Sequence, residues 1–181
     1  MWNFSNELPL DTDASLLALI NKYIPYIRDY TFQKWNRFVP ITVAVVDIPS
    51  SYDMLVETLD VDVFSTNAGY RGVDFQDLWS GDRTPGFSGF TNLSRNYDKP
   101  VLISEIGWHQ LNNTVTQAIP DWSNQIWADL VKHIDQGCIG GVFFEFSDEP
   151  YSKVGNNRFV LFSLIFDRSS STNYGSCCLC T

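Results

Sequence analysis

The sequence of 181 residues has few basic residues and only two histidines. Its 12 Lys and Arg stand against 21 Asp and Glu, so the formal net charge is -9. Binding nucleic-acid phosphates needs a basic face, and we therefore expect no nucleic-acid partner. The two histidines, His109 and His133, lie too far apart in the sequence for metal-ligand spacing. We expect no metal ion and no other cofactor.

Long apolar runs and several common catalytic motifs are also absent from the sequence. No run of 18 apolar residues occurs, so we expect no transmembrane helix in this chain. There is no Gly-x-Ser-x-Gly nucleophile elbow, and no glycine-rich phosphate loop follows a predicted strand. No signal peptide precedes Trp2, so the sequence predicts no location, although a longer parent protein could be secreted or held at the cell surface. The oligomeric state is left open.

Cysteines are few and crowd the end of the chain. They are Cys138, Cys177, Cys178 and Cys180. We expect Cys138, which precedes an apolar run, to be a small buried apolar residue. Residues 168–181 are rich in Ser and then in Cys, and we expect a disordered tail there, after one folded domain over residues 1–167. The redox state of the tail cysteines is left open.

Apolar runs alternate with stretches of helical periodicity along the chain. Short apolar or β-branched runs predict strands at residues 1–6, 41–46, 61–67, 101–104 and 139–146. Helical spacing predicts helices at residues 16–35, 52–59, 90–97 and 122–134. We expect the first helix to be capped by Asp11 or Asp13, to bend near Pro25 and to cover one face of the sheet. We expect Asp121 to cap the last helix, with His133 on its surface. Strands that alternate with helices predict an α/β fold with a parallel sheet.

Two glutamates end predicted strands. Glu105 follows the buried run Val101–Ser104, and Glu7 follows the first strand directly after Asn6. Charge is rarely buried without a partner, so packing alone does not explain a carboxylate at the end of a buried strand. A solvated glutamate at a strand end is the alternative. Glycoside hydrolysis needs such a pair, because one carboxyl group acts as acid and base while the other attacks the sugar or guides water.

The order and spacing of these motifs carry a family resemblance. Asn6-Glu7, followed 98 residues later by Glu105 within Ile103–Gly107, resembles the signature of the clan of retaining glycosidases built on TIM barrels. In that clan the Asn-Glu pair ends barrel strand four and the second Glu ends strand seven. The resemblance implies Glu7 as acid and base, Glu105 as nucleophile and Asn6 as the residue that holds the sugar 2-hydroxyl. It also implies the C-terminal portion of a (β/α)8 TIM barrel, strands four to eight over residues 1–166, with the first three units missing.

The end of the last predicted strand refines the resemblance. Its sequence, Phe143-Phe-Glu-Phe-Ser-Asp-Glu-Pro-Tyr151, is similar to that of fungal-type β-1,3-glucan remodelling transferases of the same clan. The similarity favours a β-glucan as substrate. Glu145 becomes a candidate for binding sugar hydroxyls, whereas we expect Asp148 and Glu149 to be solvated rim charges.

Further side chains are candidates for binding substrate at the same edge of the sheet. The full candidate set is Asn6, Asn67, Tyr70, Trp79, Trp108, His109 and Glu145. Tyr70 stands where the clan often places a Tyr that hydrogen-bonds the nucleophile, and packing on Trp79 is the alternative. Trp79 lies in a predicted loop at residues 75–89 and could be a sugar platform, although aromatic residues, 15% of the chain, also suit a core. We expect Asp47, after the second strand, to be a cap or loop charge.

Together these features predict a retaining glycoside hydrolase or transglycosylase that acts on a β-linked polysaccharide by double displacement. The negative net charge suits a neutral polysaccharide as partner. A truncated barrel that at most binds carbohydrate, without cleaving it, is the alternative. A metal hydrolase with two carboxylates would need histidines that the sequence lacks. The sugar, the linkage and the acceptor are left open.

Overall fold

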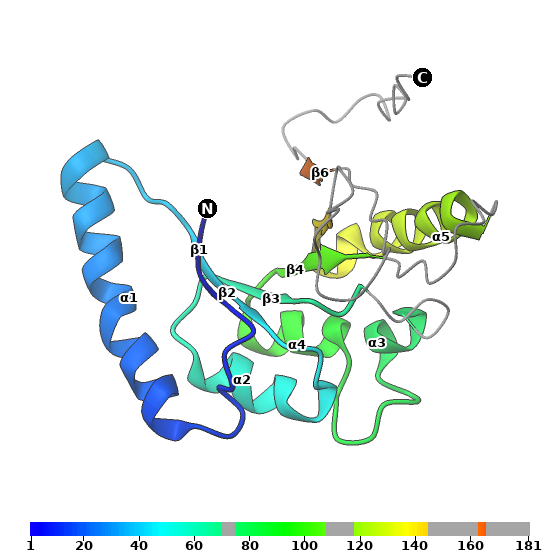
Figure 1. Ribbon diagram of the computed structural model, residues 1–181, viewed down its shortest axis with the longest axis horizontal. Helices are drawn as coiled ribbons and strands as arrows, with labels where there is room; N and C mark the ends of the chain where they lie inside the picture. Colours follow the sequence, from blue (N-terminus) through cyan, green and yellow to red (C-terminus); the bar gives the residue numbers. More distant parts are fainter. Residues whose placement is uncertain (70–74, 108–117, 145–162, 166–181) are drawn as a thin grey trace, which may run out of the picture.

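A computed structural model describes residues 1–69, 75–107, 118–144 and 163–165 of the chain (Figure 1). In chain order the elements are β1 (Trp2–Asn6), α1 (Ala14–Trp35), β2 (Ile41–Val45), η1 (Pro49–Ser51), α2 (Tyr52–Thr58), β3 (Val63–Thr66), α3 (Asp77–Ser80), α4 (Phe90–Tyr97), β4 (Val101–Ile106), α5 (Ala118–Lys132), η3 (Ile134–Gln136), β5 (Cys138–Phe143) and β6 (Ser163–Ile165). The strands form one sheet in the order β1-β2-β3-β4-β5-β6, and the first five run parallel. The predicted α/β fold with a parallel sheet is confirmed for those five strands. β6 pairs antiparallel with β5, an arrangement that the sequence did not indicate.

Some local predictions differ from the structure. α5 begins at Ala118, so Asp121 lies inside the helix and the predicted cap there is wrong. The segment predicted as a loop contains the short helix α3. His133 is buried, with 6% of its surface exposed, and not a surface residue of the helix. The predicted tail, residues 168–181, lies outside the described residues.

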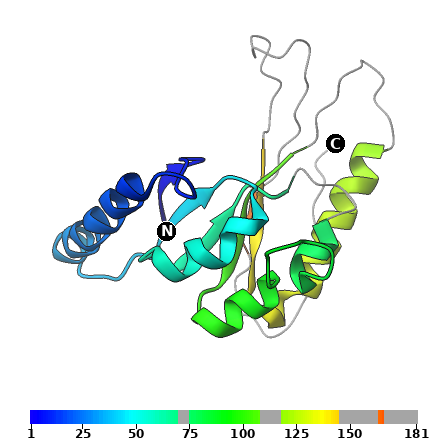
Figure 2. The ribbon, with the colours of Figure 1, turned by 90° about the horizontal axis from the view of Figure 1, so that it is seen from below.

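The core lies between the sheet and the helices on one of its faces. Figure 2 shows α2, α4 and α5 (cyan to yellow-green) on the same side of the strands. Tyr52 of α2 is fully buried, with ring centroids 5.4 Å from Phe64 of β3 and 5.7 Å from Phe90 of α4. Cys138 is buried as predicted, and burial raises the pKa of its thiol to about 11, so it is a neutral packing residue at physiological pH. This packing leaves the carboxyl ends of the parallel strands together at one edge.

α1 begins at the predicted cap. Asp13 Oδ1 accepts the backbone N–H groups of Ser15 and Leu16, each at 3.0 Å, which satisfies two donors that have no partner within the helix. The hydroxyl of Ser15 also donates to Asp13 and lowers the pKa of that carboxyl group. The helix then runs through Pro25 to Trp35 and ends at Asn36, whose backbone is left-handed.

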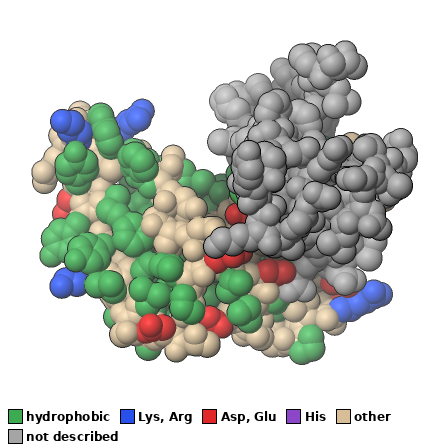
Figure 3. All heavy atoms as spheres, in the orientation of Figure 1, with side chains coloured by type: hydrophobic (Ala, Val, Ile, Leu, Met, Phe, Trp, Pro, Cys, Tyr) green, Lys and Arg blue, Asp and Glu red, His purple; other side chains and the backbone are tan. Residues whose placement is uncertain are grey.

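α1 buries only a narrow face. Ile20, Ile24 and Thr31 are its buried residues, whereas Tyr23 and Tyr30, predicted on the same covered face, are 46% and 61% exposed. Figure 3 shows hydrophobic side chains (green) gathered over the part of the molecule where α1 lies. α1 therefore covers the sheet with Ile20 and Ile24, as predicted. The prediction that Tyr23 and Tyr30 are also covered is wrong.

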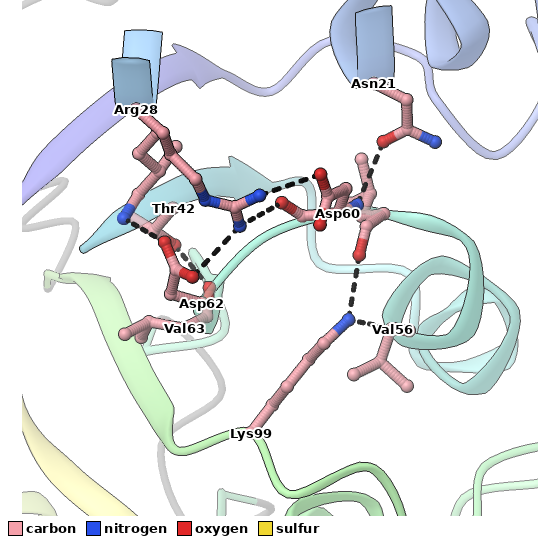
Figure 4. Close-up of polar contacts among 10 residues, drawn as sticks. Asn21, Arg28, Thr42, Val56, Asp60, Asp62, Val63 and Lys99 are labelled. Atoms are coloured by element: carbon pink, nitrogen blue, oxygen red, sulfur yellow. Dashed lines mark hydrogen bonds and ion pairs between the residues drawn. The ribbon is translucent and has the colours of Figure 1, made fainter. Parts of the chain in front are cut away.

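A polar cluster attaches α1 to the amino ends of β2 and β3 (Figure 4). Arg28 Nη1 lies 2.8 Å from Asp60 Oδ2, and its Nη2 lies 2.9 Å from Asp62 Oδ1. The other oxygen of Asp62 accepts the backbone N–H of Ile41 at 2.8 Å, so one carboxylate joins the helix to the first residue of β2. Lys99 lies nearby and donates to two carbonyl groups at the end of α2, at 2.7 and 2.8 Å. Burial lowers the pKa of Lys99, and the negative charges of Asp60 and Asp62 oppose that shift.

Replacing Arg28 by Met should lower the free energy of unfolding by about 1–2 kcal/mol, because charge-assisted hydrogen bonds from a partly buried guanidinium are lost while the carboxylates remain. Urea denaturation at neutral pH measures this loss. Arg83→Met is the matched control, since Arg83 is 81% exposed and lies 3.7 Å from Asp77. The control should change stability by less than about 0.5 kcal/mol. Equal losses in the two variants would mean that Arg28 does not attach α1.

Candidate active site

Glu7 stands at the carboxyl edge of the sheet in an unusual backbone conformation. Its φ angle is 51°, in the left-handed region, and its N–H donates to the carbonyl of Ala44 at 2.8 Å. A left-handed conformation costs a residue with a side chain about 1–2 kcal/mol. Such strain is common where a side chain must be aimed at a site. The side chain of Glu7 is exposed, as a group that meets substrate must be.

The strand register shifts beside both predicted catalytic glutamates. The pairing of β1 with β2 shifts between Asn3 and Asn6, directly before Glu7. The pairing of β4 with β5 shifts between Ile103 and Ile106, a stretch that contains Glu105. Bulges of this kind bend a strand, re-aim its side chains and are enriched next to active sites. The two shifts are therefore local structural evidence that both positions depart from regular sheet geometry.

Asn67 connects the end of β1 to the end of β4. Its Nδ2 donates to Glu7 Oε1 at 2.9 Å and to Asn6 Oδ1 at 3.1 Å. Its Oδ1 accepts the hydroxyl of Ser104 at 2.8 Å. The residue is buried, with 2% of its surface exposed, so these bonds use both donors and the acceptor of the amide away from bulk water. Asn67 therefore fixes the carboxylate of Glu7 relative to the strand that carries Glu105.

This connection also crosses one intervening strand of the sheet. β1 and β3 are not neighbours, because β2 lies between them. Side chains of alternate strands approach one another inside a barrel, and long side chains such as Glu can also reach across one strand of a flatter sheet. The contact of Asn67 with Asn6 and Glu7 is of this type.

Glu105 is the fifth residue of β4 and is half-buried. The prediction placed it directly after the strand, whereas the strand includes it. Its carbonyl accepts the N–H of Gly69 at 3.1 Å. A Cβ at Gly69 would lie 2.5 Å from that carbonyl oxygen and 2.5 Å from Ile106 Cα, so only glycine permits this approach. Ser104, next to Glu105, bonds to Asn67, so the strand that carries Glu105 is joined to Glu7 through this amide.

A second set of hydrogen bonds lies at the ends of β2 and β3. The hydroxyl of Tyr52 lies 2.8 Å from Asp47 Oδ1 and 2.6 Å from Thr66 Oγ1. Asp47 is therefore engaged in the structure of the loop, in agreement with its predicted role as a cap or loop charge. Thr66 directly precedes Asn67, so the same set holds the backbone from which Asn67 extends.

The structure corrects the prediction for Trp79. This residue is 1% exposed and stacks on His133, with ring centroids 4.5 Å apart and planes at 5°. It also meets Phe90 edge to face at 5.3 Å. Both ring contacts hold the indole among the helices and away from solvent. Trp79 is therefore a core residue and not a sugar platform. A cavity of about 440 Å³ lies beside it between α3, α4 and the end of α5.

Of the other predicted site residues, the structure brings Asn6, Glu7 and Asn67 into direct contact. Four candidates lie outside the described residues: Tyr70, Trp108, His109 and Glu145. The sequence analysis missed Ser104 and Gly69. Strand alternation could have indicated Ser104, because it places a hydroxyl on the face opposite the buried Ile103. No comparable pattern marks Gly69, whose role depends on a contact with another strand.

Comparison with protein-family models, with curated protein sequences and with solved structures finds no match to this chain. Within the described ranges, no helix combines the length and apolar character needed to cross a membrane. The same ranges contain no cluster of three or more metal-ligating side chains.

Replacing Asn67 by Asp should lower stability in a pH-dependent way. The new carboxylate would face Glu7 across a contact that is now 2.9 Å, and two like charges so close favour retention of a proton. A group that binds protons more tightly in the folded state contributes stability at low pH and loses it as pH rises. We expect a loss of about 1–3 kcal/mol at pH near 7.5 and a smaller loss near 4.5.

Urea unfolding at the two pH values measures the effect. Asn67→Ala is the control, because it removes the same hydrogen bonds without adding a charge, and its loss should be similar at both pH values. A pH-independent loss in Asn67→Asp would show that the amide does not hold the glutamate in solution.

Proposed function

We propose that this chain carries the catalytic edge of a retaining glycoside hydrolase or transglycosylase that acts on a β-linked polysaccharide, with β-glucan favoured. The observation that carries the proposal is the hydrogen-bonded link from Glu7 through Asn67 to Ser104, the neighbour of Glu105. It supports a shared site for the two carboxylates that the motif resemblance selects. The resemblance also favours the C-terminal part of a TIM barrel, and the five parallel strands with contacts between alternate strands are compatible with it.

The proposed mechanism is double displacement. Glu105 attacks the anomeric carbon and forms a covalent glycosyl ester as the glycosidic bond breaks, while protonated Glu7 gives its proton to the departing oxygen. Glu7, now a carboxylate, takes a proton from water or from a sugar hydroxyl, which attacks the anomeric carbon and releases Glu105. Water gives hydrolysis and a sugar hydroxyl gives transglycosylation. No cofactor takes part in this scheme.

The surrounding residues have defined tasks in this scheme. Asn67 donates to one oxygen of Glu7 and leaves the other oxygen of that carboxyl group for the proton that is transferred. Asn6 accepts a hydrogen bond from the same Asn67 amide through its Oδ1. Its side-chain NH₂ group donates to a sugar hydroxyl. Register shifts in β1 and β4 lie beside the two glutamates. The retaining reaction requires their carboxyl groups to lie about 5–5.5 Å apart.

Trapping of the glycosyl ester tests the proposal. Incubation with an activated 2-fluoro β-glucoside should add one sugar to the intact mass, and peptide mapping should locate the sugar on Glu105. β-Glucan oligosaccharides that bind, but are neither cleaved nor transferred, and that bind equally to Glu7→Gln and Glu105→Gln, would instead establish a carbohydrate-binding module. A label on any other residue would remove Glu105 as nucleophile.

A further inference from the structure

The exposed side of α1 carries a second apolar stripe beside the buried one. Leu19, Tyr23, Tyr26 and Tyr30 follow one another at intervals of four, three and four residues. This spacing keeps apolar side chains on one line along a helix and is the spacing by which helices pack on one another in coiled coils. We call these four residues the seam. Each of them exposes between 46% and 63% of its surface.

The seam continues onto the edge strand of the sheet. Tyr30 meets Trp35 edge to face, with ring centroids 6.3 Å apart. Trp35 in turn stacks on Trp2 of β1 at 6.0 Å. β1 is the terminal strand of the sheet, and β2 is its only strand partner among the described residues. The seam, Trp35 and Trp2 therefore form one continuous surface from the helix to the open edge of the sheet.

This surface is as large as the largest apolar patches of monomeric proteins and could form the apolar centre of an interface. From their exposed fractions, the six side chains leave about 600 Å² of mainly apolar surface in water, taking roughly 200 Å² for each residue. The largest apolar patch on a typical monomer covers about 300–600 Å² in total. A stable protein interface needs about 800 Å² from each partner, including its polar rim. Tyr and Trp are also the residues most enriched at such interfaces.

Charges beside the seam indicate what covers it. Lys22 and Asp29 precede Tyr23 and Tyr30, so they flank the seam on one side, and both are exposed. The other flank is formed by Ile20 and Ile27, which face the core. A partner helix can therefore place its charged flank only against Lys22 and Asp29.

We propose that two copies of this chain associate through their α1 helices, packed antiparallel around a two-fold axis. In this arrangement each flank of α1 meets the same flank of the other copy. Lys22 of each copy therefore lies opposite Asp29 of the other copy. A parallel arrangement would set the charged flank against Ile20 and Ile27, which the core already covers. The association does not use the proposed catalytic residues, because the seam lies on α1 and the two glutamates lie at the ends of β1 and β4.

Sedimentation velocity of the full chain over a concentration series tests the association. The unaltered chain should sediment as a dimer at high micromolar concentration. Tyr26→Ala should weaken dimerisation roughly a hundredfold, because the central side chain of the seam is lost from both copies. Phe32→Ala is the matched control, since Phe32 is 57% exposed on α1 but lies away from the seam, and it should leave the dimer intact. Circular dichroism should show the same helix content in all variants.

Charge reversal tests the antiparallel geometry. Lys22→Asp and Asp29→Lys should each weaken the dimer roughly tenfold, because each change replaces two attractive pairs with two repulsive ones. The double variant should restore the original dimerisation constant. A monomeric unaltered chain, or equal effects of Tyr26→Ala and Phe32→Ala, would overturn the proposed interface. A double variant no tighter than either single variant would overturn the antiparallel arrangement.

Discussion

Replacing Glu105 by Gln should reduce turnover of β-glucan oligosaccharides by about 10⁴-fold or more, with little change in binding. The amide has nearly the same volume as the carboxylate but cannot form the glycosyl ester, so the first displacement is lost and only positioning and acid catalysis remain. Initial rates from reducing-end release measure turnover, and isothermal titration with a non-hydrolysed oligosaccharide measures binding. The 2-fluoro reagent should leave the mass of this variant unchanged.

A smaller nucleophile provides a sharper test of the same role. Glu105→Gly removes the side chain, and azide added to this variant should restore turnover of an activated β-glucoside and give an α-glycosyl azide. The inverted product would show that the side chain of residue 105 occupies the α face of the sugar. Glu57→Gln is a suitable control for general loss of acidic charge, because Glu57 is an exposed carboxylate on α2. Turnover of Glu105→Gln at more than a tenth of the original rate would exclude Glu105 as nucleophile.

Replacing Glu7 by Gln should have an effect that depends on the leaving group. Loss of a positioned general acid typically costs about 10²–10⁴-fold for a substrate whose leaving oxygen needs a proton. A 2,4-dinitrophenyl glycoside, whose leaving group departs without a proton, should still form the glycosyl ester at close to the original rate. The ester should then accumulate, because the same residue is missing as base for the second step.

Burst kinetics and intact mass measure this accumulation. Glu57→Gln is a matched control, since Glu57 is an exposed carboxylate on α2, and it should have no effect. Equal losses for sugar and dinitrophenyl leaving groups in Glu7→Gln would contradict a role as general acid.

Most of the strand and helix positions could be predicted from the sequence, because they depend on local patterns. The β-branched run of β2 and the apolar start of β4 have few alternatives to burial in a parallel sheet. Asp13 was one of the two predicted caps, since a side-chain acceptor before an apolar helical pattern is a strong start signal. Glu7, Asn6 and Asn67 were candidates because each follows or ends a predicted strand.

The remaining features depend on contacts between distant segments. Helical periodicity showed that α1 is amphipathic, but not which of its apolar residues other elements would cover. Tyr23 and Tyr30 were therefore predicted to be covered, whereas they are exposed. Trp79 looked like a loop residue because Gly and Pro surround it, whereas stacking on His133 buries it. The three-way bonding of Asn67 joins it to residues 60 and 37 positions away in the sequence, which no local pattern encodes.

The absence of a side chain at Gly69 has an evolutionary consequence. Any Cβ there would collide with the backbone of Glu105 and Ile106, so almost no substitution is tolerated at this position. This constraint holds although Gly69 performs no chemistry. Any nucleotide change in this codon that replaces the glycine would therefore force two strands apart.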